Sequence, residues 1–124
     1  MKKTIGNFEF LTSLLISMGI TPDKKGFAYL REAIILVALD PSYLQSVTKR
    51  LYVDLADIFF VKPQDVERCI RFAIGISYSS GGLLEINNLY GNVVYKNDYR
   101  PSNSEFIGVV ADKISPYVKS ASLA

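Results

Sequence analysis

Two arginines and a glutamine recur between residues 63 and 78 at the spacing of one helix face. Gln64, Arg68 and Arg71 fall on one side of a helix with 3.6 residues per turn, and apolar residues fall on the other side. Arginine can donate two parallel hydrogen bonds to guanine, and glutamine can pair with adenine in a similar way. Side chains of these types in this pattern favour a helix that reads base edges in DNA.

The apolar side of the same stretch fits the second helix of a helix-turn-helix. Such a unit needs a small residue where its first helix crosses the second, and apolar residues that lock the two helices at a steep angle. Ala56 supplies the small residue in a helix predicted at 47–60, and Pro63 begins a second helix at 63–78. The inner face of that second helix is predicted to comprise Val66, Cys69, Ile70, Ala73 and Ser77.

Further candidate contacts flank this face. Lys49, Arg50 and Lys62 are placed where they can bind backbone phosphates and fix the docking of the helix. Phe72 lies beside the base-reading face, where it either anchors a protein partner or tucks against a neighbouring helix.

A plainer interpretation of the pattern stays open. Glu67 and Arg71 are four residues apart and can pair along a solvated helix for a few tenths of a kcal/mol. Helix-turn-helix geometry also occurs in proteins as simple packing. The residue pattern alone does not decide between DNA reading and a solvated face.

Apolar periodicity and the glycine and proline positions predict an all-α fold of about six helices. Ser102 and Glu105 are spaced as a capping box at the start of the last helix. The stretch 92–101 has weak strand character and is expected to form a loop or a lone hairpin. A single domain over residues 1–124 is predicted, with an ordered core of about 8–115. The predicted helices are 8–18, 26–40, 47–60, 63–78, 83–91 and 102–115.

Composition argues against an enzyme. The chain has no histidine, which removes the commonest general base and metal ligand. Its one cysteine, Cys69, falls on the apolar stripe and fits a core residue in a reducing compartment. Asp54 and Asp57 are three residues apart without a further ligand nearby, which favours a solvated face. We expect no catalytic residue, no metal and no cofactor.

The first residues do not predict export or membrane insertion. Asn7 and Glu9 interrupt the apolar run that follows the first lysines, so an amphipathic helix is favoured over a signal peptide. The longest unbroken apolar run, at 33–39, is far shorter than the ~20 residues a membrane span needs. We expect a cytoplasmic protein with no membrane partner.

Four segments of the chain resemble one protein family. They read KGFAYLREAI at 25–34, SVTKRLYVDLA at 46–56, VERCIRFAI at 66–74 and RPSNSEFIGVVADKI at 100–114. In this order and spacing they resemble the C-terminal DNA-binding effector domain of the sporulation initiation master response regulator of endospore-forming Firmicutes, the stage zero sporulation protein A family. The resemblance covers roughly residues 8–115.

The resemblance implies a wing-free, six-helix domain whose third and fourth helices form the helix-turn-helix. The fourth helix of the family enters the major groove, and pairs of domains bind tandem operator boxes head to tail on double-stranded DNA. A homodimer on DNA and the sigma subunit of RNA polymerase are therefore candidate partners. Carried over residue by residue, the groove-facing positions are Gln64, Asp65, Glu67, Arg68 and Arg71.

Four positions depart from the family pattern. The family usually has arginine where this chain has Asp65, histidine where it has Phe72, and arginine where it has Ser80. Phe60 stands in the turn, where the family favours a small polar residue suited to a left-handed conformation, so the turn is either strained or built differently.

These departures leave two hypotheses for function. The first is a sequence-specific regulator of sporulation or related stationary-phase genes. The second is a protein-interaction module that has lost operator binding and modulates the full-length regulator or RNA polymerase. The receiver domain of the family has no counterpart in the sequence, so the chain is expected to be an excised fragment or a free-standing effector domain, and the start MKKTIGNF slightly favours the latter.

Overall fold

The computed structural model describes the backbone of residues 2–123 and the side chains of residues 9–118. These residues form helices and loops and no strand, so the fold is all-α, as predicted. Two 3-10 turns, η1 (Pro41–Gln45) and η3 (Gly82–Leu84), and one π-helical turn, η2 (Val47–Leu51), join the longer helices. The α-helices are α1 (Lys2–Ser17), α2 (Lys25–Leu39), α3 (Tyr52–Phe59), α4 (Pro63–Ser80), α5 (Glu85–Tyr90) and α6 (Asn103–Leu123).

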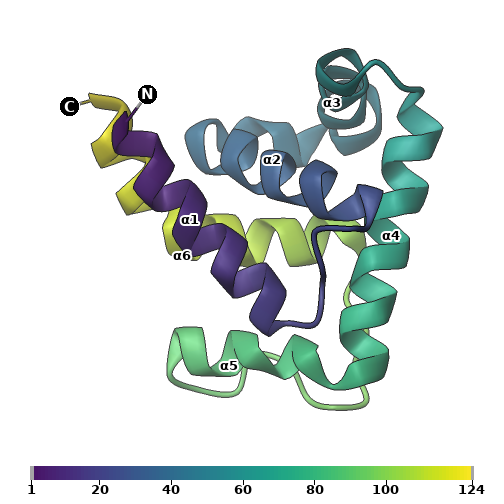
Figure 1. Ribbon diagram of the computed structural model, residues 1–124, viewed down its shortest axis with the longest axis vertical. Coiled ribbons are helices and arrows are strands. Elements are labelled where there is room, and N and C mark those ends of the chain that lie inside the picture. Colours follow the sequence, from purple (N-terminus) through teal and green to yellow (C-terminus); the bar gives the residue numbers. More distant parts are fainter. Residues whose placement is uncertain (1, 124) are drawn as a thin grey trace.

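Helix α2 is the centre of the packing. It lies along α6 and also contacts α4, α3 and α1 (Figure 1). Helix α4 stands at one side of the molecule, with α3 at its first end and the η3–α5 segment at its last end (Figure 1). One side of α4 therefore packs on the rest of the domain, and the other side is available to a partner.

The core is a single apolar cluster to which the helices contribute periodic positions. Helix α2 contributes a buried stripe formed by Leu30, Ala33, Ile34 and Val37. Leu11 of α1 and Phe106 of α6 are fully buried against the same cluster. Burial of this apolar surface stabilises the arrangement, at roughly 25 cal/mol for each Å² removed from water.

A close crossing fixes how α4 is rotated against α2. A Cβ atom on Gly26 would lie 2.2 Å from the carbonyl oxygen of Cys69 and 3.0 Å from Cβ of Ala73. No side chain fits a gap of 2.2 Å, so glycine is required at this crossing. The crossing decides which face of α4 is buried and which is exposed.

The predicted helix boundaries are close for the central helices and short at the two outer ones. Helix α1 begins at Lys2 rather than near residue 8, and α6 continues through Pro116 to Leu123 rather than ending at 115. Proline usually ends a helix because it lacks a backbone N–H. Here Val118, beyond the proline, is buried in the core and so favours continuation of the helix. Whether the ordered core is limited to 8–115 stays a prediction.

The stretch 92–101 is a loop, and one side chain holds it in place. The amide of Asn87 accepts hydrogen bonds from the backbone N–H groups of Val94, at 2.8 Å, and Tyr95, at 3.0 Å. It also donates to the carbonyl of Tyr95 at 2.9 Å. The ring of Tyr95 is buried, so this loop is anchored to the domain through both backbone and side chain.

The start of α6 has the predicted cap in part. The hydroxyl of Ser102 accepts a hydrogen bond from the backbone N–H of Glu105 at 3.2 Å, as in a capping box. The carboxylate of Glu105 accepts the hydroxyl hydrogen of Tyr99 at 2.6 Å. The loop before α6 is thereby tied to the first turn of that helix.

None of the helices among the described residues combines the length and the apolar run that a bilayer-spanning segment needs.

Candidate nucleic-acid interface

Helices α3 and α4 form the helix-turn-helix. The backbone N–H groups of Phe60 and Val61 both donate to the carbonyl of Ala56, which closes the end of α3. Ala56 is buried, as its predicted role at the crossing requires. The ring of Phe59 packs against that of Tyr29, with centroids 4.8 Å apart, and so attaches the unit to α2.

Phe60 is strained in the turn. Its φ of 57° and ψ of 46° are left-handed, and its side chain is 94% exposed. The turn therefore keeps the left-handed geometry, and the first of the two sequence-based alternatives is confirmed. A left-handed conformation costs a residue other than glycine about 1–2 kcal/mol.

The two faces of α4 divide as the spacing predicts. Arg68, Arg71 and Phe72 are exposed, and Gln64 is exposed in the first turn. Cys69 is only half-buried, because it lies at the margin of the contact with α2. The buried residues of α4 are Val66, Ile70, Ala73, Ile74 and Ser77.

Both arginines of the exposed face pair with carboxylates of their own helix. Arg68 Nη2 lies 2.6 Å from Asp65 Oδ1, and Arg71 Nε lies 3.0 Å from Glu67 Oε2. Arg71 Nη2 lies 3.4 Å from the second oxygen of Glu67, and hydrogen bonding to Glu67 raises the pKa of the Arg71 guanidinium. These solvent-exposed pairs place a carboxylate beside each guanidinium and so lower the local net charge.

Glu67 is also tied to α6. The amide nitrogen of Asn103 lies 3.2 Å from the carbonyl oxygen of Glu67 and 3.4 Å from its carboxylate. The same nitrogen donates to the hydroxyl of Tyr52 at 3.1 Å, and burial raises the pKa of Tyr52. Glu67 therefore links Arg71 to the start of α6, a position suited to orienting that arginine.

The three predicted phosphate-binding residues differ in their surroundings. Lys49 and Lys62 are exposed. Arg50 is engaged, because its guanidinium lies 2.8 Å from the Asp40 carboxylate and 4.1 Å from the centre of the Tyr43 ring. Hydrogen bonds from Ser42 and then Arg50 lower the pKa of Asp40. Arg50 thus also holds η1 against η2.

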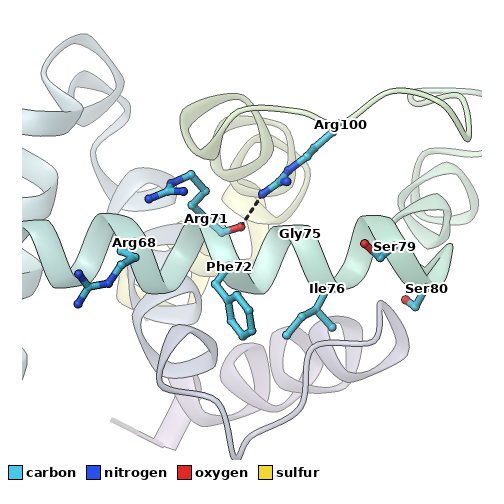
Figure 2. Close-up of a pocket in the computed structure, with 8 residues that line it drawn as sticks. All are labelled: Arg68, Arg71, Phe72, Gly75, Ile76, Ser79, Ser80 and Arg100. Atoms are coloured by element: carbon cyan, nitrogen blue, oxygen red, sulfur yellow. Dashed lines mark hydrogen bonds between the residues drawn. The ribbon is translucent and has the colours of Figure 1, made fainter.

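A third guanidinium lies on the exposed side of α4. Arg100, from the loop before α6, donates through Nη2 to the carbonyl of Arg71 at 3.0 Å (Figure 2). It lines an open pocket of about 690 Å³ together with Arg68, Arg71 and Gly75.

Sequence reasoning did not select Arg100 as a site residue. The available signal was Gly75, a glycine in the middle of a helix, which often marks close approach of another group.

A protein-family model described as "Sporulation initiation factor Spo0A C terminal" matches residues 11–114. The chain belongs to this family. The match includes all of α2 to α5, with the complete helix-turn-helix, and most of α6. The Spo0A C-terminal family is the all-α DNA-binding effector domain of a sporulation response regulator and is not an enzyme family.

Two of the positions that the resemblance singles out as departures have structural roles. Asp65 lies in the first turn of α4, where a negative charge favours the helix dipole, and pairs with Arg68. The hydroxyl of Ser80 donates to the carbonyl of Ser77 at 3.1 Å and accepts from the N–H of Gly82 at 3.2 Å, which helps to end α4. Both residues stabilise the helix, and Asp65 also lowers the positive charge around its first turn.

Phe72 points away from Arg100 and Arg71 (Figure 2). Its side chain is 61% exposed and lines a second, smaller pocket of about 400 Å³ with Lys24, Lys25 and Cys69. Phe72 also lines the larger pocket with the three arginines, so it is not tucked into the core and stands between the two pockets.

Within the described part of the chain, no three side chains of His, Cys, Asp or Glu come close enough to hold a metal ion. Asp54, the first of the two aspartates on α3, accepts the hydroxyl hydrogen of Tyr43 at 2.5 Å.

Proposed function

We propose that this chain is a sequence-specific DNA-binding transcription regulator that reads tandem operator boxes through α4 and acts on sporulation or related stationary-phase genes. One observation supports it above all: in a Spo0A C-terminal helix-turn-helix, the exposed face of α4 presents two oriented arginines, Arg68 and Arg71.

The carboxylate pairs leave hydrogen-bond donors for bases. A guanidinium has five N–H donors in a planar fork. In Arg71 the pair with Glu67 uses Nε and one N–H of Nη2, so the edge made by Nη1 and Nη2 can still donate two parallel bonds to guanine. Arg68 contacts Asp65 through Nη2 and keeps further donors in the same way. Gln64, in the first turn of α4, is the candidate for adenine.

The remaining predicted residues position the helix. Lys49 and Lys62 are the exposed candidates for phosphate contacts, and Arg50 can add a contact from its place on Tyr43. Two domains bound head to tail on tandem boxes would form a homodimer on DNA.

A second candidate function is protein interaction without operator reading, with the full-length regulator or RNA polymerase, including its sigma subunit, as the partner. The observation in its favour is Phe72, a large aromatic side chain that is 61% exposed beside Arg68 and Arg71, which are both paired with carboxylates. Co-purification of the partner with the wild-type chain, and its loss in Phe72→Ala, would support this function.

Substitution of the two arginines tests the first function. Arg68→Ala and Arg71→Ala should each weaken binding to a duplex with two tandem copies of the family operator by ~1–3 kcal/mol, and weaken binding to a scrambled duplex much less. Lys113→Ala is the control, because Lys113 lies on α6 beside Tyr90 and lines a different pocket. Operator affinity equal to that of the control in both variants would contradict base reading by α4.

A further inference from the structure

Arg100 differs electrostatically from the other arginines of its pocket. Ion pairs join Arg68 and Arg71 to carboxylates, and among the described residues none joins Arg100. The only hydrogen bond described for it uses one of its donors, to the carbonyl of Arg71. No ion pair among the described residues compensates its charge, and the residue is exposed and lines the open pocket.

The loop holds Arg100 in position from both sides. The preceding residue, Tyr99, donates its hydroxyl hydrogen to Glu105 and stacks near Tyr95, with ring centroids 5.7 Å apart. The following residue, Pro101, is buried. The backbone at Arg100 is therefore restrained, and less conformational freedom is lost there when the residue binds a ligand.

Gly75 provides the space for this guanidinium. A Cβ atom on Gly75 would lie 2.9 Å from Arg100 Nη2 and 3.3 Å from its Cζ. Glycine in the middle of an exposed helix costs about 1 kcal/mol relative to alanine. Here the glycine leaves the space that lets Arg100, from the loop before α6, approach the backbone of α4.

We propose that Arg100 is a binding residue for a DNA backbone phosphate beside the second half of α4. This inference rests on the proposed function, since it requires α4 to dock on DNA. The guanidinium lies against the helix backbone rather than at the tip of a side chain projecting from α4. A phosphate strand passing along the side of the helix comes within its reach, whereas the bases lie farther along the projecting side chains. Ser79, one turn beyond Gly75 in the same pocket, offers a hydroxyl donor to the same phosphate (Figure 2).

The salt dependence of DNA binding tests the proposal. Each phosphate neutralised by a cation contributes about 0.9 to the slope of log K against log salt. Arg100→Gln should reduce that slope by about 0.9 and weaken binding to operator and scrambled duplexes by the same factor. Lys113→Gln removes an equal charge from α6, away from this pocket, and should leave the slope almost unchanged. A slope in Arg100→Gln equal to that in Lys113→Gln would overturn the proposal.

Gly75→Ala provides a second test that does not depend on weakening the fold. The added methyl group must shift the tip of the Arg100 side chain, while alanine favours the helix. We expect the slope to fall by less than in Arg100→Gln, because the shifted guanidinium keeps its charge, with no fall in the unfolding midpoint, and no further fall when Gly75→Ala is added to Arg100→Gln. Additive losses in the double variant would contradict a shared origin in Arg100.

The wild-type chain separates the two proposals. If it binds neither duplex, the proposed function fails and the inference fails with it. If it prefers the operator while Arg100→Gln behaves as Lys113→Gln, only the inference fails.

Discussion

Two regions of the exposed side of α4 carry arginines in different electrostatic states. In the first half, Arg68 and Arg71 are held by Asp65 and Glu67. In the second half, Arg100 enters from another segment and has a backbone carbonyl as its described partner. A carboxylate fixes the direction of an arginine but cancels its long-range attraction for DNA, whereas an unpaired arginine keeps that attraction. In the proposed function, base reading and phosphate attraction therefore belong to different residues, and local charge at Arg100 would allow a chain of net charge +2 to bind DNA.

The largest expected effect is on the free energy of unfolding, and it comes from a substitution in the buried face of α4 that supports both regions. Ile70 is fully buried on the inner face of α4. Ile70→Ala should lower the free energy of unfolding by ~2–5 kcal/mol, because it leaves a cavity where α4 packs on the core. Urea denaturation followed by circular dichroism measures the change. Arg68→Ala, on the exposed face, should change it by less than about 0.5 kcal/mol. Equal losses in the two variants would contradict the division of α4 into a packing face and a binding face.

A smaller change in stability is expected from a substitution in the turn between α3 and α4, which lies outside both arginine regions. Phe60→Gly should raise the free energy of unfolding by about 1 kcal/mol, because glycine adopts the left-handed conformation without strain and the exposed ring loses little contact. The matched control is Phe72→Gly, an exposed phenylalanine within the helix, which should lower stability by about 0.5–1 kcal/mol. Thermal unfolding of the two variants should show a higher midpoint for Phe60→Gly and a lower midpoint for Phe72→Gly. A lower midpoint in Phe60→Gly would contradict the argument from the left-handed turn. The salt slope of DNA binding should stay at its wild-type value in Phe60→Gly.

The smallest expected change in stability comes from a substitution that removes the carboxylate paired with Arg68. This substitution tests the electrostatic difference between the two regions directly. Asp65→Asn frees Arg68 and should cost only about 0.2–0.5 kcal/mol of stability. It should also make the salt slope of DNA binding steeper, by up to about 0.9, because Arg68 regains its net charge. Asp57→Asn on α3 is the control, since it removes the same charge without freeing Arg68. An unchanged slope in Asp65→Asn would mean that the pair with Arg68 is already broken on DNA.

The sequence was sufficient to predict the features of α4 that depend on local spacing. Period 3.6 identified the inner residues Val66 and Ile70, and Pro63 identified the first turn. The opposite face followed from the same geometry. The family motif then predicted the helix-turn-helix, which the family match supports.

Contacts between distant segments could not be predicted in this way. The approach of Arg100 to Arg71 depends on the path of the loop 92–101, and that path depends on hydrogen bonds from Asn87 that no periodicity indicates. The pairing of Asp65 with Arg68 could have been predicted from the sequence, because the two residues are three positions apart on one helix. The end of α6 was not predicted, because its continuation past Pro116 depends on burial of Val118 against distant parts of the core.

The most direct measurement of whether α4 reads DNA is fluorescence anisotropy with the wild-type chain. It is titrated onto a duplex with two tandem family operator boxes and onto a scrambled duplex, each at two salt concentrations. We predict tighter binding to the operator at both concentrations, with affinity for both duplexes falling as salt rises. Equal affinity for the two duplexes, or no binding to either, would contradict operator reading by α4.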